Sequence, residues 1–352
     1  MLKPKNPPRS LVVLVMVFTV ALSSRVARAA DDKDDEDEPA RKPGWTPGLF
    51  VGGSVDFTGN DGVVGQADGI NLAMGAMVEG ELEYNEGIHQ WRAALDFGLG
   101  ANIVPAAGEI EKADDNLDFE TLYRAHFVEQ AGVFARVSAT TTMLASYEFT
   151  DKKVTYEITR PDGSVEELRG RRLQLTEPFR PTTFKESVGG FVEPVEDDHL
   201  DLYVEGGLGA HETIAAGQLA FKDDPKTATV EVLELQDSFQ IGAEGSVTAS
   251  GDIDNKGIAS YEASVNVLVP LAHSDVAPGD DPPIEDLVYV QVKGGLDLEV
   301  SDWLSLHYEL EVLRQPLVID TVQVTNVFYL TVDGAWGSKA PVKPKPACAC
   351  QK

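Results

Sequence analysis

The chain has 352 residues, 58 of them acidic and 29 basic, which gives a formal net charge of −29 at pH 7. Such a charge repels nucleic acid and anionic phosphates, so nucleic-acid binding is disfavoured before any motif is considered. Only two cysteines occur, Cys348 and Cys350, and their position near the C-terminus excludes a fold stapled by disulfides.

Residues 1–30 have the features of a secretory signal peptide. Three basic residues precede an apolar run over residues 11–22, and Ala27-Arg28-Ala29 supplies the small residues that a signal peptidase recognises. A retained membrane anchor is disfavoured, because a helix that crosses a bilayer needs about 20 apolar residues. We expect cleavage near Ala29, which removes five basic residues and changes the net charge from −29 to −34.

Two polar segments are predicted to be disordered. Residues 31–44 hold seven carboxylates and too few apolar side chains to offset the entropy of ordering, which predicts an acidic linker. In residues 336–352 proline alternates with lysine, which favours an extended, solvated tail. Cys348 and Cys350 either bind a soft metal, exchange disulfides with another molecule, or have no partner.

Residues 45–335 repeat an alternation of apolar and polar residues with a period of two. Between residues 90 and 103, Trp91, Leu95 and Phe97 share one face while Arg92 and Asp96 share the other. Many such segments reach the 9–11 residues that a tilted strand needs to cross a bilayer. Twelve segments show the pattern: 49–57, 70–84, 90–103, 117–128, 133–149, 184–192, 199–212, 238–249, 258–269, 287–300, 304–312 and 321–332.

The connections between these segments alternate between short and mostly longer. Outer-membrane barrels sort their connections in this way, because one rim carries periplasmic turns and the other carries extracellular loops. The pattern therefore predicts an all-β, up-and-down antiparallel transmembrane β-barrel of about twelve strands, with both termini on the rim of the short turns. The short turns are expected at 85–87, 130–132, 196–198, 251–257 and 301–302, and the longer connections near 58–69, 104–116, 150–183, 215–237, 270–286 and 315–320.

Two Asp-Gly segments are predicted to be turns. Pro161-Asp162-Gly163-Ser164 is expected to turn a small hairpin within 150–183. Gly251 to Gly257 has the acidic spacing of a calcium loop, but Lys256 occupies a ligand position and Ala263 stands where a closing Glu is needed. Asp and Gly favour turns because they tolerate positive φ and cap their own backbone.

On this pattern of strands and turns, the segment from Trp45 to Asp333 resembles the Gram-negative outer-membrane β-barrels. Within that class it is similar to the porin-like barrels of about twelve strands that follow a signal peptide and an acidic linker. The resemblance implies an outer-membrane location, contact with lipid and periplasmic termini. One departure is that Phe328 and Tyr329 lie inside the last segment, whereas barrels of this class usually end on an aromatic residue.

If the apolar faces contact lipid, the polar faces surround the interior. A narrow acidic lining concentrates cations and excludes anions, which predicts a passive, weakly cation-preferring channel for small solutes. The alternative is a packed lumen with a static network of ion pairs. The residues expected to line the lumen are Glu79, Glu81, Arg92, Asp96, Asp118, Glu120, Arg124, Arg136, Asp201, Glu205, Lys293, Asp297, Glu299, His307, Glu309 and Glu311.

Two further functions fit the same periodicity. One is a non-conducting barrel whose extracellular loops bind a partner or have a structural role, with the tails contacting unidentified periplasmic partners. The other is a secreted, soluble β-sandwich that binds a ligand and buries the apolar faces between its sheets.

Catalysis is the weakest hypothesis for this chain. His126, His199, His211 and His307 fall on or near the expected inner faces, and His307 beside Ser305 and Glu309 is the best local candidate for a general base. Residues two apart share a face in any β-strand, so this spacing alone is weak. We predict no enzymatic activity, no cofactor and no metal site.

Aromatic residues lie near the ends of several predicted strands: Trp45, Trp91, Trp303, Tyr84 and Tyr147. Barrels carry aromatic girdles at such positions, where the wall meets the lipid headgroups. Hydrophobic burial would also explain them if the sheet were soluble, so they add only modest support for the barrel.

Overall fold

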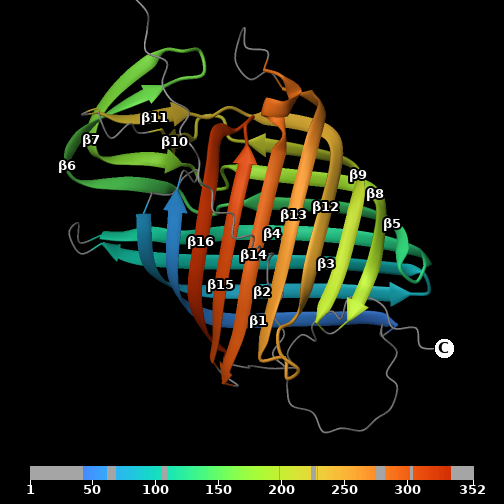
Figure 1. The fold of residues 1–352 in the computed structure, drawn as a ribbon. Coiled ribbons are helices and arrows are strands. Elements are labelled where there is room, and N and C mark those ends of the chain that lie inside the picture. The colour runs from blue at the N-terminus through green and yellow to red at the C-terminus, as the bar shows by residue number, and fades with distance from the viewer. Residues whose placement is uncertain are drawn as a thin grey trace, which may run out of the picture.

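The computed structural model describes residues 43–61, 69–104, 109–197, 199–222, 227, 229–274, 282–301 and 304–333. The predicted signal peptide, nearly all of the acidic linker, Trp303 and the tail with both cysteines lie outside the described residues. The described strands form a closed barrel and a separate four-stranded sheet (Figure 1). No helix in these ranges is long and apolar enough to span a membrane.

Twelve strands form the barrel, and every neighbouring pair is antiparallel. The first strand pairs with the last, as in Val55 with Leu330, so the sheet has no free edge. Each predicted segment corresponds to one barrel strand, and the predicted fold class is confirmed. The strands are β1 (Gly44–Asp61), β2 (Gly69–Glu86), β3 (His89–Val104), β4 (Glu109–Val128), β5 (Ala131–Thr141), β8 (Thr182–Asp197), β9 (Leu200–Ile214), β12 (Ser238–Asp252), β13 (Ala259–His273), β14 (Tyr289–Ser301), β15 (Leu304–Gln315) and β16 (Ile319–Asp333).

The apolar faces of these strands point outward. Leu49, Val188 and Leu271 are 63%, 57% and 73% exposed, although they are aliphatic and belong to the barrel wall. A water-soluble sandwich would bury such side chains between its sheets. The soluble alternative is therefore wrong, and the wall has the apolar exterior of a membrane barrel.

One rim, the short-turn rim, joins β2 to β3, β4 to β5, β8 to β9, β12 to β13 and β14 to β15. Gly87 and Gly257 adopt φ of +58° and +65° in two of these turns. In the β12–β13 turn, Asp254 accepts hydrogen bonds from the backbone N–H groups of Ala259 and Lys256 at 2.9 and 3.3 Å. This segment is thus a turn, as predicted.

The opposite rim, the long-loop rim, is less regular than predicted. The β3–β4 connection is short because pairing continues to Val104 and Glu109, beyond the apolar alternation of both segments. The β15–β16 connection is a turn of residues 316–318, closed by a hydrogen bond from Val318 N–H to the Gln315 carbonyl at 2.9 Å. The 3-10 helix η1 (Ile284–Leu287) precedes β14 on this rim.

The predicted strand 133–149 is wrong at its C-terminal end. β5 ends at Thr141, and β6 (Ser146–Thr159) begins a second sheet. The carboxylate of Asp115 on β4 accepts the N–H groups of Met143 and Leu144 at 3.0 and 2.6 Å and so stabilises the break. Tyr147 consequently lies in the second sheet and not in a barrel girdle.

The second sheet has the order β10-β11-β6-β7, with β7 (Val165–Thr176), β10 (Leu219–Phe221) and β11 (Val230–Glu234). Its strands come from the connections 150–183 and 215–237, which we had expected to be loops apart from one hairpin. That hairpin is confirmed, since Gly163 between β6 and β7 has φ +80°. The sheet lies at the upper left of Figure 1, on the long-loop rim.

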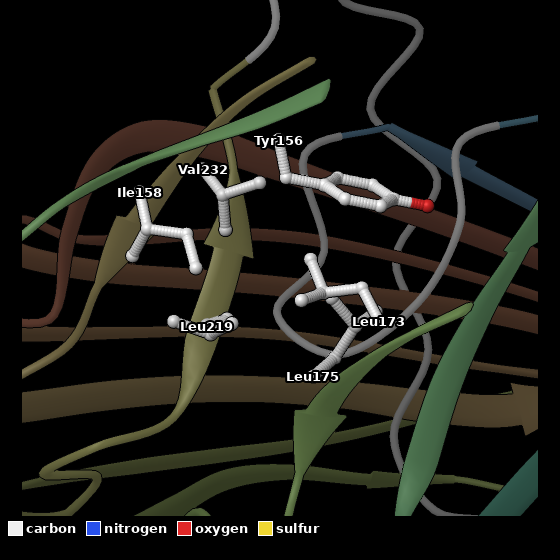
Figure 2. Packing of buried hydrophobic residues seen from close by; sticks show 6 residues of the cluster. All are labelled: Tyr156, Ile158, Leu173, Leu175, Leu219 and Val232. Carbon is white, nitrogen blue, oxygen red and sulfur yellow. The ribbon is translucent and has the colours of Figure 1, made fainter. Parts of the chain in front are cut away.

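The second sheet has a hydrophobic core of its own. Figure 2 shows its side chains pointing toward one another between the strands. A second cluster, in which Ala220 and Leu235 pack with Ile319, attaches the sheet to the β15–β16 turn. The side chains of the core are Tyr156, Ile158, Leu173, Leu175, Leu219 and Val232, each at most 8% exposed.

Candidate functional site: the barrel interior

The strand register places all sixteen expected lining residues on the inner face of the barrel. Directly paired residues of antiparallel strands point to the same side, so the pairs Glu79 with Asp96 and Asp96 with Asp118 form one inner row across β2, β3 and β4. Among the ionisable residues of the interior that were not predicted from the sequence are Lys185, Glu193, Glu244 and Glu262. All four lie in or beside segments that were predicted as strands, so the alternation itself would have identified them.

Five of the inner residues form a chain of alternating charge, here named the charge ladder: Glu81, Arg92, Glu120, Arg136 and Glu205. The closest nitrogen–oxygen distances are 4.0 Å from Arg92 to Glu81, 2.9 Å from Arg92 to Glu120 and 3.6 Å from Arg136 to Glu120. Arg136 also donates to both carboxylate oxygens of Glu205, with one bond of 2.9 Å. The ladder crosses from β2 to β9.

A glycine of β8 leaves room for the contact between Arg136 on β5 and Glu205 on β9. Gly189 of β8 pairs with Phe134 on one side and Gly207 on the other, and it adds no side chain between Arg136 and Glu205. A Cβ atom at Gly189 would lie 2.1 Å from the carbonyl oxygen of Gly206. The two strands approach so closely here that only glycine fits.

Water reaches part of the charge ladder. The side chains of Arg92 and Glu120 are 31% and 33% exposed although they face the interior, whereas Arg136 and Glu205 are 21% and 4% exposed. The ladder is therefore solvated at the β3–β4 end and buried at the β9 end. Glu205 also accepts hydrogen bonds from the Tyr203 and Ser246 hydroxyls at 2.9 and 3.1 Å.

A second group of inner residues spans the interior between β8 and β14. Lys185 Nζ donates to Tyr289 Oη at 2.8 Å and to Gln291 Oε1 at 3.2 Å. Three strands lie between β8 and β14 in the wall, so four inter-strand spacings of about 4.8 Å separate the two strands by about 19 Å along the sheet. The Lys185 side chain therefore bridges the interior. The ring of His211 packs edge-on against Tyr289 at 4.6 Å.

Toward the short-turn rim, the inner faces of β4, β5 and β8 contribute an apolar cluster to the interior. Leu122, Phe134 and Phe191 are buried together, each at most 3% exposed. The guanidinium of Arg124 lies 4.4 Å from the centre of the Tyr203 ring and 3.5 Å from Glu193. This corner of the interior is packed and not open.

Two of the four candidate histidines, His307 and His199, lie in different environments. His307 hydrogen-bonds through Nδ1 to Asp297 of β14 and packs against the ring of Tyr329. The expectation for His199 is wrong, because it is exposed in the β8–β9 turn and bonds to the β12–β13 turn through the Asp252 carbonyl and Asn255. Within the described ranges, no cluster of three metal-ligating side chains is found.

An aromatic cluster lies on the outer wall at the short-turn rim. Trp45 packs 4.8 Å from Tyr84 and 5.5 Å from Trp91, and it is 60% exposed. His89 Nδ1 and Tyr123 Oη, beside this cluster, are 2.6 Å apart. Three of the five expected girdle residues thus lie together at one end of the barrel.

A closed, up-and-down antiparallel barrel of twelve strands with an apolar exterior and a charged interior defines the class of outer-membrane β-barrels. A family model described as "Protein of unknown function (DUF3078)" matches residues 66–147, from before β2 to the start of β6. No curated protein matches the chain.

Solved structures that are similar to the chain include the translocator domain of the autotransporter NalP from Neisseria meningitidis, at 12% identity and a TM-score of 0.38 over 81% of this chain and 88% of that one. The NanC porin is 7% identical, with a TM-score of 0.36 over 80% of this chain and 99% of that one. An outer membrane channel from Pseudomonas putida F1 is 9% identical, with a TM-score of 0.37 over 85% and 100%. These similarities are too distant to transfer a function.

Proposed function

We propose that the mature protein is an outer-membrane channel, passive and weakly cation-preferring, for small solutes. The observation that carries this proposal is the partial exposure of Arg92 and Glu120 in the barrel interior, which indicates water beside fixed charges. Cleavage near Ala29 would leave both termini on the periplasmic side, the side of the short-turn rim.

The charge balance of the inner face supports the preference for cations. The sixteen residues that we expect to line the lumen include eleven carboxylates but only four arginine or lysine side chains. Ion pairs in the charge ladder neutralise some of these carboxylates. If each of the four cations is paired with one carboxylate, seven of the eleven carboxylates remain without a cationic partner in this set. Fixed negative charge along a narrow path raises the local concentration of cations.

Conductance in planar bilayers tests the proposal. The purified protein, reconstituted in a potassium chloride gradient, is expected to give small current steps. Its reversal potential is expected to have the sign of a channel that is more permeable to K⁺ than to Cl⁻. A folded protein that carries no current at any voltage would contradict the channel. A heat-modifiability gel serves as the folding control, because a folded barrel and a boiled one migrate differently.

The second sheet supports a second candidate, in which this surface binds an anionic partner. Five exposed basic residues gather around the irregular pairing between Phe149 and Val154: Lys152, Lys153, Arg169, Arg171 and Arg172. Among the described residues, none of the five forms an ion pair. Arg172 lies 3.8 Å from the centre of the Tyr147 ring, which holds its guanidinium at the surface.

Although the net charge of the whole chain repels anionic phosphates, this local basic surface would recognise phosphorylated lipid headgroups, because arginine binds phosphate in a bidentate manner. The test is binding of the detergent-solubilised protein to micelles with and without a phosphorylated lipid. We expect R169Q/R171Q to weaken binding and R160Q to leave it unchanged, since Arg160 is already paired with Glu166 and Glu234. Equal binding to both micelles would contradict this candidate.

A further inference from the structure

The second sheet covers part of the long-loop rim. Its β10–β11 segment lies in the connection between β9 and β12, yet Leu233 and Leu235 pack with Val318 and Ile319 of the β15–β16 turn. The segment therefore crosses part of the barrel mouth.

Hydrogen bonds fix this cover to the rim. The side-chain amide oxygen of Gln218 accepts the Glu177 N–H at 2.6 Å, and Arg180 donates to the Ala216 carbonyl at 3.0 Å. Asp237 accepts the N–H groups of Ala215 and Ala216 at 2.8 and 2.9 Å. These bonds join the β5–β8 connection to the β9–β12 connection and close the β9–β12 connection at its base, while the contact with the β15–β16 turn is hydrophobic.

Below the cover lies a small polar cavity. Its wall includes His211, Gln240 and Gln315, together with the ring of Tyr289. The hydroxyl of the same tyrosine accepts a hydrogen bond from Lys185 of β8, so the Lys185 bridge lies beside this cavity. Leu268 on β13, which is fully buried, completes the packing of the inner face at this level.

Lys185 differs from the other inner cations in the direction of its contacts. Lys293 lies 3.9 Å from Glu311 on the adjacent strand β15, so its side chain follows the wall. Arg92 and Arg136 each contact Glu120 on β4, in the ladder described above. Lys185 reaches from β8 to β14, and its described hydrogen bonds go to the neutral groups of Tyr289 and Gln291.

We infer that Lys185, held across the interior by Tyr289 and Gln291, forms the constriction that sets the conductance and moderates the cation preference of the channel. This inference rests on the proposed function. A positive charge in a narrow passage repels permeating cations, so it opposes the acidic wall. The ammonium and the tyrosine ring also occupy space that solutes would otherwise cross.

Removal of the charge and of the bridge tests the inference. K185M keeps an unbranched side chain that is one atom shorter and loses the ammonium. We expect its single-channel conductance to rise at least twofold, with a reversal potential shifted further in the direction of cation selectivity. The matched control is K293M, which removes the same charge from the wall without opening a bridge. It is expected to shift the reversal potential only slightly and to leave conductance within about 20% of wild type.

Y289F weakens the hydrogen-bonded bridge while it keeps the positive charge of Lys185. It deletes only the hydroxyl that Lys185 contacts, and we expect more frequent transitions between conductance levels because the lysine loses one of its two partners. A heat-modifiability gel on each variant establishes that the barrel has folded.

The four outcomes distinguish the inference from the proposed function. A conducting wild type with a more conductive K185M supports both. Equal currents from wild type and K185M contradict the role of Lys185 and leave the channel intact. A silent wild type with a conducting K185M supports the constriction but contradicts a constitutively open channel. Silence of both folded proteins overturns both.

Discussion

Arg136 is the residue of the charge ladder whose removal should affect stability most. It contacts Glu120 at 3.6 Å and both carboxylate oxygens of Glu205, and the Glu205 side chain is only 4% exposed. R136Q would leave that carboxylate buried with only the Tyr203 and Ser246 hydroxyls as described partners. Breaking a buried ion pair from one side costs about 3–5 kcal/mol, so with the arginine itself 21% exposed we expect about 3 kcal/mol.

The double variant R136Q/E205Q should recover most of this loss. When both charges are absent no uncompensated carboxylate remains, and replacing both partners of such a pair is often nearly neutral. The control is R92Q. Its pair with Glu120 is 31% and 33% exposed, and exposed pairs contribute at most about 1 kcal/mol.

Equilibrium urea unfolding in lipid vesicles, followed by tryptophan fluorescence, measures these differences. The order of stability is expected to be wild type, then R92Q and R136Q/E205Q, then R136Q. If the double variant is as unstable as R136Q, or if R92Q costs as much as R136Q, the idea of a ladder that is buried at one end and solvated at the other is refuted.

Three further predictions concern other parts of the molecule. G189A should abolish the folded, heat-modifiable barrel, because its Cβ would lie 2.1 Å from the carbonyl oxygen of Gly206. G190A should fold, because its Cβ would lie 3.6 Å from the nearest atom. Equal yields of the two folded variants would contradict the close approach of β8 and β9. L175A truncates a core side chain that is 2% exposed and should destabilise the second sheet by about 2–5 kcal/mol. Limited proteolysis should then cleave within 142–181 while the barrel remains folded. An unchanged digest would show that this sheet has no core of its own. The hydrogen bond from Ala259 N–H lowers the pKa of Asp254. The ionised carboxylate should therefore stabilise the β12–β13 turn above the usual aspartate pKa of about 3.9, and this stabilisation should be lost as the pH falls through the lower pKa of the folded state. Hydrogen exchange at the Ala259 amide should report this loss as reduced protection at low pH, and D254N should abolish the pH dependence.

Much of the barrel was determined by local sequence. The alternation in 90–103 fixes which side chains face lipid, because successive residues of a strand point to opposite sides. Each of the twelve predicted segments became a barrel strand, and Asp-Gly turns such as the one at Asp254 formed where they were expected. The inner positions of Arg92, Glu120 and Arg136 follow from the same periodicity.

The tertiary structure alone decided which inner residues meet. The parallel pairing of β11 with β6 joins segments about 75 residues apart, such as Val230 with Tyr156, and no local signal encodes it. The break after Thr141 depends on Asp115 of another strand, so 133–149 read as one segment. The bridge from Lys185 to Tyr289 arises because the closed sheet brings the inner faces of β8 and β14 within reach of each other's long side chains. Periodicity specifies only the side of a strand on which a residue lies and not the distance across a closed sheet.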